Sequence, residues 1–292
     1  MKSTYLLWML AGLNVFFCSC HHHAHGSHIK NDTKSNIDIR KFISKNAWDT
    51  LFPHRYGYNK NNTAKTDFYS FESFANAATH FPQFLAEGDE ISEKKELAAF
   101  LAAIAYESSQ DDSITQKTDY LDWGLAVLAS PYTSNNENRY DTTNKGLPSP
   151  KNANYYGRGP MQLRGYSDYQ KFGEIWFDKD SILLQDPDQL IADPETAFAS
   201  AIWWWTTPHG SAPSCHDVIT GNWEPTMADI TKGRFAGFGS VVNIISGGIK
   251  CGMGYDDETN VRRFKFYKKF CDYLHVDTGG DISCKDAQPF GS

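Results

Sequence analysis

The chain has 292 residues, enough to bury a sizeable core, and aromatic residues make up 14% of it. Its formal net charge is −7 at pH 7 and it has no long basic run, which argues against nucleic acid as the main partner. The basic cluster near the C-terminus follows a helical pattern and is expected to be a solvated face, formed by Arg262, Arg263, Lys265, Lys268 and Lys269.

The N-terminus predicts export. Lys2 precedes an apolar stretch, Tyr5 to Phe17, that is too short to span a membrane and is typical of a secretory signal. Ser19 before Cys20 resembles a bacterial lipoprotein processing site, with Cys20 as the lipid-bearing residue over a signal of residues 1–20. Ordinary signal cleavage nearby is the alternative. Either reading places the protein outside the cell or at its envelope.

A histidine-rich segment, HHHAHGSH, opens a polar stretch over residues 21–38 that is predicted to be a flexible tether. Weak metal capture by this tract is the alternative to a plain solvated tether, and we favour the tether. One domain then covers residues 39–292. Neither a CxxC pair nor a Cys/His ligand spacing is present, so no structural metal and no cofactor are expected.

The strongest helix signal begins near Ser92 and ends at Glu107, with apolar residues at helical spacing between them. Glu93 and Glu96 suit its first turn, where the helix dipole favours anions. A polar loop, Ser130 to Asn154, follows further on.

The run YYGRGPMQL, from Tyr155 to Leu163, leads into an apolar-periodic segment, Tyr166 to Ile175. Two glycines flank Arg158, so the backbone can turn sharply and approach a ligand closely. The paired tyrosines offer flat faces of the kind that pack on sugar rings, and Gln162 offers an amide with donor and acceptor capacity.

Two more helices follow. The first of these helices starts at Asp193, which can cap it, and Pro194 fits the first helical position. Its apolar face carries Phe198, Ile202 and Trp205. The other runs from about Glu258 to Leu274. Trp203, Trp204 and Trp205 cannot all face inward, since successive helical residues differ by about 100°. An exposed ring among them would stack on sugar, but core packing is the favoured reading of the run. The chain is therefore predicted to be mainly α.

The run YYGRGPMQL resembles the central motif of the family 19 chitinases, and the resemblance extends from about Ile43 to Phe290. It implies a two-lobed, lysozyme-like fold with a central cleft and long loops. It also implies an inverting hydrolase, acting as a monomer, that cleaves β-1,4-linked N-acetylglucosamine polymers. The further matching segments are ISKNAWDTLFPHR, YSFESFANAATHFPQF, ELAAFLAAIAYES, the stretch from Asp186 to Trp223, GFGSVVNIISGGIKCG and the stretch from Val261 to Phe290.

Within this resemblance Glu107, in AYES, matches the general acid, and Tyr106 stands where the family usually has histidine. The residues that match the family's substrate-binding set are Tyr156, Arg158, Gln162, Asn243 and Arg263. Cys251 and Cys284 match a pair that the family bridges, whereas the pairing of Cys215 and Cys271 stays open.

An inverting glycosidase needs a second carboxylate as general base to activate water. Ser130 stands where the resemblance puts that glutamate, so this carboxylate is missing from its expected position. Glu137 is the first candidate to replace it, and Asp111 and Asp112 are the alternatives.

Other polar positions of the cleft are also changed, to Arg164, Ala199, Ser246 and Lys250. The scaffold is kept while the polar residues of its cleft are changed, and such a pattern often accompanies an altered function. The readings are therefore a hydrolase of chitin or peptidoglycan, a non-catalytic glycan binder on the same fold, and an envelope protein with a vestigial cleft.

Overall fold

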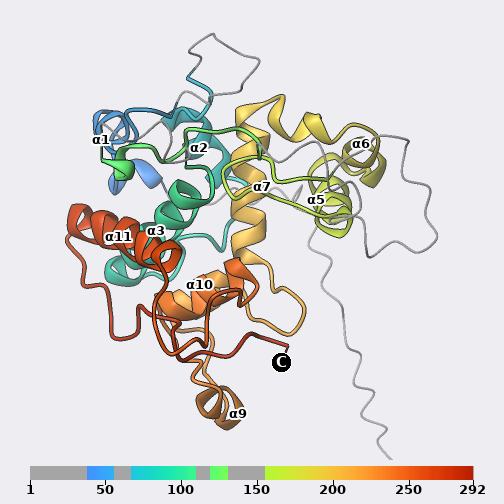
Figure 1. Ribbon diagram of the computed structural model, residues 1–292. Coiled ribbons are helices and arrows are strands. Elements are labelled where there is room, and N and C mark those ends of the chain that lie inside the picture. Colours follow the sequence, from blue (N-terminus) through green and yellow to red (C-terminus); the bar gives the residue numbers. More distant parts are fainter. Residues whose placement is uncertain (1–37, 56–66, 110–118, 131–154, 292) are drawn as a thin grey trace, which may run out of the picture.

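The computed structural model describes residues 38–55, 67–109, 119–130 and 155–291. Within these ranges the fold is helical, and β pairing is limited to isolated bridges. The prediction of a mainly α chain is confirmed (Figure 1). The α-helices are α1 (Lys45–Leu51), α2 (Phe71–Ala78), α3 (Glu90–Glu107), α5 (Tyr166–Phe177), α6 (Asp180–Gln185), α7 (Pro194–Thr206), α8 (Cys215–Thr220), α9 (Met227–Thr231), α10 (Phe238–Ser246) and α11 (Glu258–Leu274). Short 3₁₀ turns are η1 (Ile39–Lys41), η2 (Tyr120–Asp122) and η3 (Pro187–Ile191).

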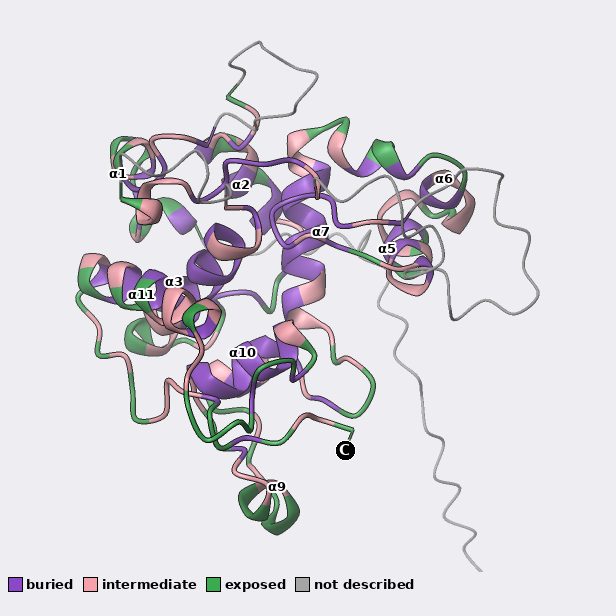
Figure 2. Cartoon of the chain, in the orientation of Figure 1, coloured by how far each residue is buried: buried purple, intermediate pink, exposed green. Residues whose placement is uncertain are grey.

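Helix α7 runs through the middle of the molecule (Figure 1). It packs against α2 and α8, while α3 packs against α11 and α8, and α5 packs against α6. Buried residues concentrate along α3, α7 and α10, whereas α9 is largely exposed (Figure 2). No helix in the described ranges is both long and apolar enough to cross a membrane.

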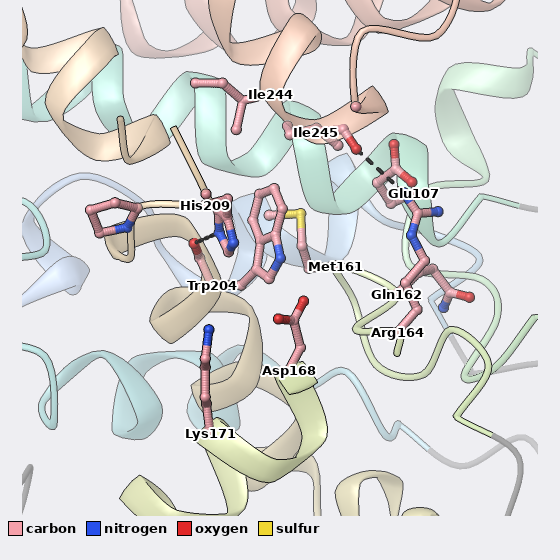
Figure 3. Close-up of a pocket in the computed structure, with 13 residues that line it drawn as sticks. Glu107, Met161, Gln162, Arg164, Asp168, Lys171, Trp204, His209, Ile244 and Ile245 are labelled. Carbon is pink, nitrogen blue, oxygen red and sulfur yellow. Dashed lines mark hydrogen bonds between the residues drawn. The ribbon is translucent and has the colours of Figure 1, made fainter. Parts of the chain in front are cut away.

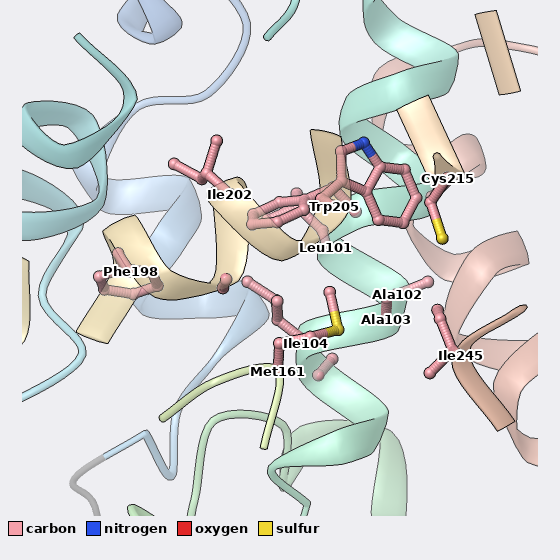
Figure 4. Close-up of a cluster of buried hydrophobic side chains, with 14 of the residues drawn as sticks. Leu101, Ala102, Ala103, Ile104, Met161, Phe198, Ile202, Trp205, Cys215 and Ile245 are labelled. Atoms are coloured by element: carbon pink, nitrogen blue, oxygen red, sulfur yellow. The ribbon is translucent and has the colours of Figure 1, made fainter. Parts of the chain in front are cut away.

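Helices α3 and α7 share one hydrophobic core. Ile104 of α3 and Ile202 of α7 are fully buried in it, together with Trp205. Met161, from the loop before α5, inserts into the same cluster and is 6% exposed (Figure 4). Burying a side chain of this size stabilises by about 1.5–3 kcal/mol, so the core also anchors the loop that carries Met161.

The helix ends follow local capping rules. Asp193 accepts a hydrogen bond from the Thr196 backbone N–H at 2.7 Å, as predicted for the start of α7. Helix α3 begins at Glu90, two residues before the predicted start at Ser92. The reason is that Asp89 is the cap, since its carboxylate accepts from the Ser92 backbone N–H at 3.0 Å.

The expectation that Glu96 lies in the first turn of α3 is wrong. Because the helix starts earlier, Glu96 lies further along it and is fully buried in the core. Its carboxylate accepts three hydrogen bonds, from the Leu85 backbone N–H at 2.9 Å, Trp205 Nε1 at 2.9 Å and His216 Nδ1 at 2.7 Å. A buried carboxylate needs such partners, and these join α3, α7 and α8.

The basic cluster on α11 is only partly a solvated face, so that expectation also needs correction. Lys269 reaches inward and donates to the Leu121 carbonyl at 2.7 Å and to the Leu51 carbonyl at 3.2 Å. Arg263 is also turned toward the protein, where it binds a carboxylate. Lys265 and Lys268 are exposed, as expected.

The predicted disulfide between Cys251 and Cys284 is confirmed. It ties the segment after α10 to the C-terminal segment, and the Gly252 backbone N–H donates to the Cys284 carbonyl at 2.9 Å beside it. Cys215 and Cys271 are buried free thiols. Burial raises the pKa of both, so they behave as core residues in this fold.

Candidate active site

The motif loop, residues 155–165, makes a tight turn between residues 128–130 and α5. Arg158 and Leu163 exchange backbone hydrogen bonds of 3.1 and 2.9 Å, and Gly159 between them has φ = 75°. This left-handed backbone favours glycine, and a Cβ at Gly159 would also lie 3.1 Å from Leu190. The sharp turn predicted from the two glycines is therefore present, and it presents Gln162 to solvent-accessible space.

Arg158 fixes this loop from within. It is 3% exposed, and its Nε donates to the Asp188 carboxylate at 2.7 Å. Its Nη1 donates to the Tyr169 hydroxyl at 2.9 Å, and its guanidinium lies 3.6 Å from the centre of the Tyr156 ring. Burial raises the pKa of Tyr169, so the hydroxyl keeps its proton and donates to the Tyr156 carbonyl at 2.8 Å. Arg158 thus shapes the loop.

The expectation that both tyrosines offer a face to sugar is wrong for Tyr155. Its ring is 2% exposed and its hydroxyl donates to the Leu184 carbonyl at 2.8 Å, so it belongs to the core. Tyr156 is partly exposed, with one face occupied by Arg158.

Glu107 is the last residue of α3, and Arg263 of α11 binds it. Arg263 Nη2 donates to Glu107 Oε1 at 2.8 Å, and both side chains are 13% exposed. The guanidinium lies 4.0 Å from the centre of the Tyr106 ring, which covers it from α3. Two of the predicted site residues are therefore in direct contact, and Tyr106 holds the arginine in place.

A cavity of about 360 Å³ opens beside Glu107 (Figure 3). The motif loop contributes Gln162 and Arg164 to its walls, and α5 contributes Asp168 and Lys171. The remaining walls come from the end of α7, the loop after it and the end of α10. A volume of this order is sufficient for part of a small polar ligand.

Asp168 is a second carboxylate in this cavity. Burial raises its pKa, while the neighbouring His209, Lys171 and Arg164 and a hydrogen bond from the Trp204 side chain act in the opposite direction. The His209 ring stacks on Trp204 at 4.0 Å and lies 2.9 Å from the Trp204 carbonyl oxygen. Burial lowers the pKa of His209, so its ring is uncharged at neutral pH.

Of the three consecutive tryptophans in α7, Trp204 is the one that lines the cavity. Trp203 and Trp205 are buried at 4% and 0% exposure, as core packing requires, while Trp204 is partly exposed. Asp168, Lys171 and His209 were not identified from the sequence. The spacing of Asp168 and Lys171, three residues apart on one helix, was the available signal that they share a face.

The remaining predicted site residues lie elsewhere. Asn243 is 1% exposed, and its Nδ2 donates to the carbonyls of Ala287 and Gln288 at 3.2 and 3.1 Å. It therefore holds the C-terminal segment against α10. The Ser130 backbone N–H donates to the Gly157 carbonyl at 2.8 Å, which pairs this residue with the motif loop. Four predicted residues lie outside the described ranges: Cys20, Asp111, Asp112 and Glu137.

Comparison with known proteins identifies relatives over most of the chain. The family described as "Chitinase class I" matches residues 42–284. Endochitinase A2 of Pisum sativum is 36% identical over 255 residues, which cover 87% of this chain and 75% of the relative. The basic endochitinase of Vitis vinifera is 35% identical over 268 residues, which cover 91% of this chain and 82% of the relative.

Solved structures agree with this assignment. Chitinase C from Streptomyces griseus superposes with a TM-score of 0.63 at 26% identity, covering 83% of this chain and 80% of that one. A bacterial family 19 chitinase superposes with a TM-score of 0.62 at 27% identity, covering 83% of this chain and 100% of that one. The expected lysozyme-like fold is confirmed by these similarities.

Proposed function

This chain belongs to the family of class I chitinases, and from that premise we propose that it hydrolyses β-1,4 links between N-acetylated sugars by an inverting mechanism. Family membership makes it a glycoside hydrolase of the chitinase type. The observation that carries the proposal is Glu107 at the edge of the cavity, bound by Arg263 at 2.8 Å. Product analysis by mass spectrometry, after incubation with chitin oligomers and with peptidoglycan, tests it.

Glu107 is proposed as the general acid. Its carboxyl gives a proton to the glycosidic oxygen as the bond from that oxygen to the sugar C1 breaks. Water adds to C1 from the opposite face and gives one of its protons to a base, so the product has a C1 hydroxyl of inverted configuration. Arg263 then stabilises the carboxylate that Glu107 becomes, because a charge-assisted hydrogen bond to an anion is stronger than a neutral one.

Glu137 is proposed as the base that replaces the missing glutamate at Ser130. We expect Glu137→Gln to lower turnover of chitin oligomers by about 10²-fold, since an amide cannot accept the proton of the attacking water. Proton NMR of freshly released reducing ends should show the inverted anomer in wild type. A neutral Glu137→Gln would reject this assignment and direct the same test to Asp111 and Asp112.

A non-catalytic glycan binder is the second candidate function. The observation that favours it is the serine at position 130, because a serine hydroxyl is a far weaker base than the glutamate that the family resemblance places there. Retention of the protein on chitin or on peptidoglycan, with no release of reducing sugar from either polymer over many hours, would establish the binder and reject the hydrolase.

Export with a lipid anchor at Cys20 is also proposed. The support is the apolar stretch before it and the small Ser19, both typical of a processed lipoprotein signal. We expect the native protein to sediment with membranes and a Cys20→Ser variant to move largely to the soluble fraction, because acyl chains supply the membrane affinity. Equal release of both forms would reject anchoring.

A further inference from the structure

Two cations line the cavity beside Glu107, and neither forms a salt bridge among the described residues, although both lie near Asp168. Arg164 extends from the motif loop, and its Nη2 lies 3.4 Å from the Ile245 carbonyl oxygen on α10 (Figure 3). Lys171 rises from α5 on the same side of the cavity as Asp168 (Figure 3). Both side chains belong to exposed residues, so both can meet a ligand that enters from solvent.

Arg263 already engages Glu107, the first of the two carboxylates of the cavity, at 2.8 Å. The second carboxylate, Asp168, lies near Arg164, Lys171 and the Trp204 side chain. Burial raises the pKa of Asp168, and His209, Lys171, Trp204 and Arg164 oppose that shift. His209 adds no charge, because burial lowers its pKa.

The local charge is therefore opposite to that of the whole chain. Arg164 and Lys171 line the cavity, and Arg263 binds Glu107 from outside the lining, so three cations stand against the carboxylates Glu107 and Asp168. The chain as a whole carries a net charge of −7. A cationic cavity in an acidic protein attracts an anionic ligand to that place and repels it elsewhere. A neutral polymer of N-acetylglucosamine gains no charge attraction from such an arrangement.

We propose that Arg164 and Lys171 form a subsite for a carboxylate on the sugar chain, so that the preferred glycan is an anionic β-1,4-linked N-acetylated polymer. This rests on the proposed function and names its substrate class. The lactyl carboxylate of N-acetylmuramic acid has this chemistry, and it is free on peptidoglycan strands from which the stem peptides have been removed. A guanidinium binds a carboxylate through two parallel hydrogen bonds, and the Lys171 ammonium adds a second charge.

The test compares three sulfur-linked tetrasaccharides, which resist hydrolysis, by calorimetric titration of the full-length chain. The first is the N-acetylglucosamine tetramer, the second alternates N-acetylglucosamine with N-acetylmuramic acid, and the third is the second with its carboxylates converted to methyl amides. We expect the carboxylate form to bind about tenfold more tightly than the amide, a ratio equivalent to about 1.4 kcal/mol. The ratio should fall as salt rises, since the side chains are exposed.

Variants then locate the effect. Arg164→Ser should reduce the ratio of the two affinities by about threefold, and Arg164→Ser with Lys171→Gln should bring it close to one. Lys285→Gln, which removes an exposed lysine outside the cavity lining, should leave the ratio unchanged. A fourth glycan bearing stem peptides separates the two carboxylate sources. If it outbinds the methyl amide, peptide carboxylates also occupy the subsite.

The outcomes distinguish this subsite from the function on which it rests. Equal affinity for carboxylate and amide, or a ratio that Arg164→Ser does not change, would overturn the subsite. If only the neutral tetramer binds, the proposed function stands and the subsite is wrong. If no glycan binds, both are wrong.

Discussion

Glu107→Gln is expected to lower the turnover of chitin oligomers by about 10²–10⁴-fold, the usual contribution of a general acid. Glutamine fills the same space and its side-chain oxygen can still accept the hydrogen bond that Arg263 donates at 2.8 Å. It cannot deliver a proton to the leaving oxygen. The loss should therefore appear in kcat, with KM and the fold little changed, and steady-state kinetics with circular dichroism would measure both.

Glu174→Gln is the matched control for this prediction. Glu174 is an exposed glutamate on α5 and does not line the cavity, so the same change of charge there should leave turnover unaltered. A Glu107→Gln enzyme with turnover within tenfold of wild type would contradict the assignment of Glu107. Loss of turnover together with unfolding would point instead to the contact with Arg263 as a structural bond.

The sequence predicted those elements whose signals are local. Asp193 and Pro194 mark the start of α7, and the apolar spacing from Glu258 to Leu274 matches α11 to the residue. Caps and periodicity act within a few residues, so they can be read without a partner. Helix α3 starts two residues before the predicted Ser92 because Asp89, an equally local signal, is its cap.

Contacts between distant segments could not be predicted in this way. Trp205 and His216, which bind Glu96, lie 109 and 120 residues further along the chain. The ion pair of Arg263 with Glu107 spans 156 residues. The family resemblance predicted that both residues belong to the site, but it did not predict the contact between them.

The cavity shows the same limit. Gln162 lines it, as the motif indicated, whereas Arg158 from the same motif is buried and braces the loop. Sequence identity with a motif cannot separate residues that meet a ligand from those that shape the loop. Asp168 and Lys171 belong to the site only through the fold, which brings α5 and Glu107 to the same cavity (Figure 3).

Glu96→Leu is expected to lower the free energy of unfolding by about 3–5 kcal/mol, the usual cost of breaking a buried ionic contact from one side. Glu96 is fully buried, and its removal leaves the Leu85 backbone N–H, Trp205 Nε1 and His216 Nδ1 without their acceptor. Each buried donor left unpaired costs about 1–3 kcal/mol. Urea unfolding followed by tryptophan fluorescence would measure the change.

Glu90→Leu supplies the comparison on the same helix. The Glu90 side chain is 69% exposed and pairs with Lys94 one turn away, and an exposed pair of this kind contributes less than about 1 kcal/mol. If Glu96→Leu destabilises no more than Glu90→Leu, the buried network does not hold α3, α7 and α8 together.

The pH dependence of stability tests the same network through the protonation of His216. Burial of His216 opposes its protonation, but its hydrogen bond to Glu96 and the charges of Glu96, Asp217 and Glu87 raise its pKa overall. Because the folded pKa lies above the unfolded value of about 6.5, this stabilisation is complete below that pH and is lost as the pH rises through the folded pKa. Wild type should therefore lose stability relative to His216→Gln as the pH is raised above about 6.5. A difference between the two that stays constant from acid to alkaline pH would show that His216 is bound to Glu96 as a neutral ring, and that the network carries no buried ion pair.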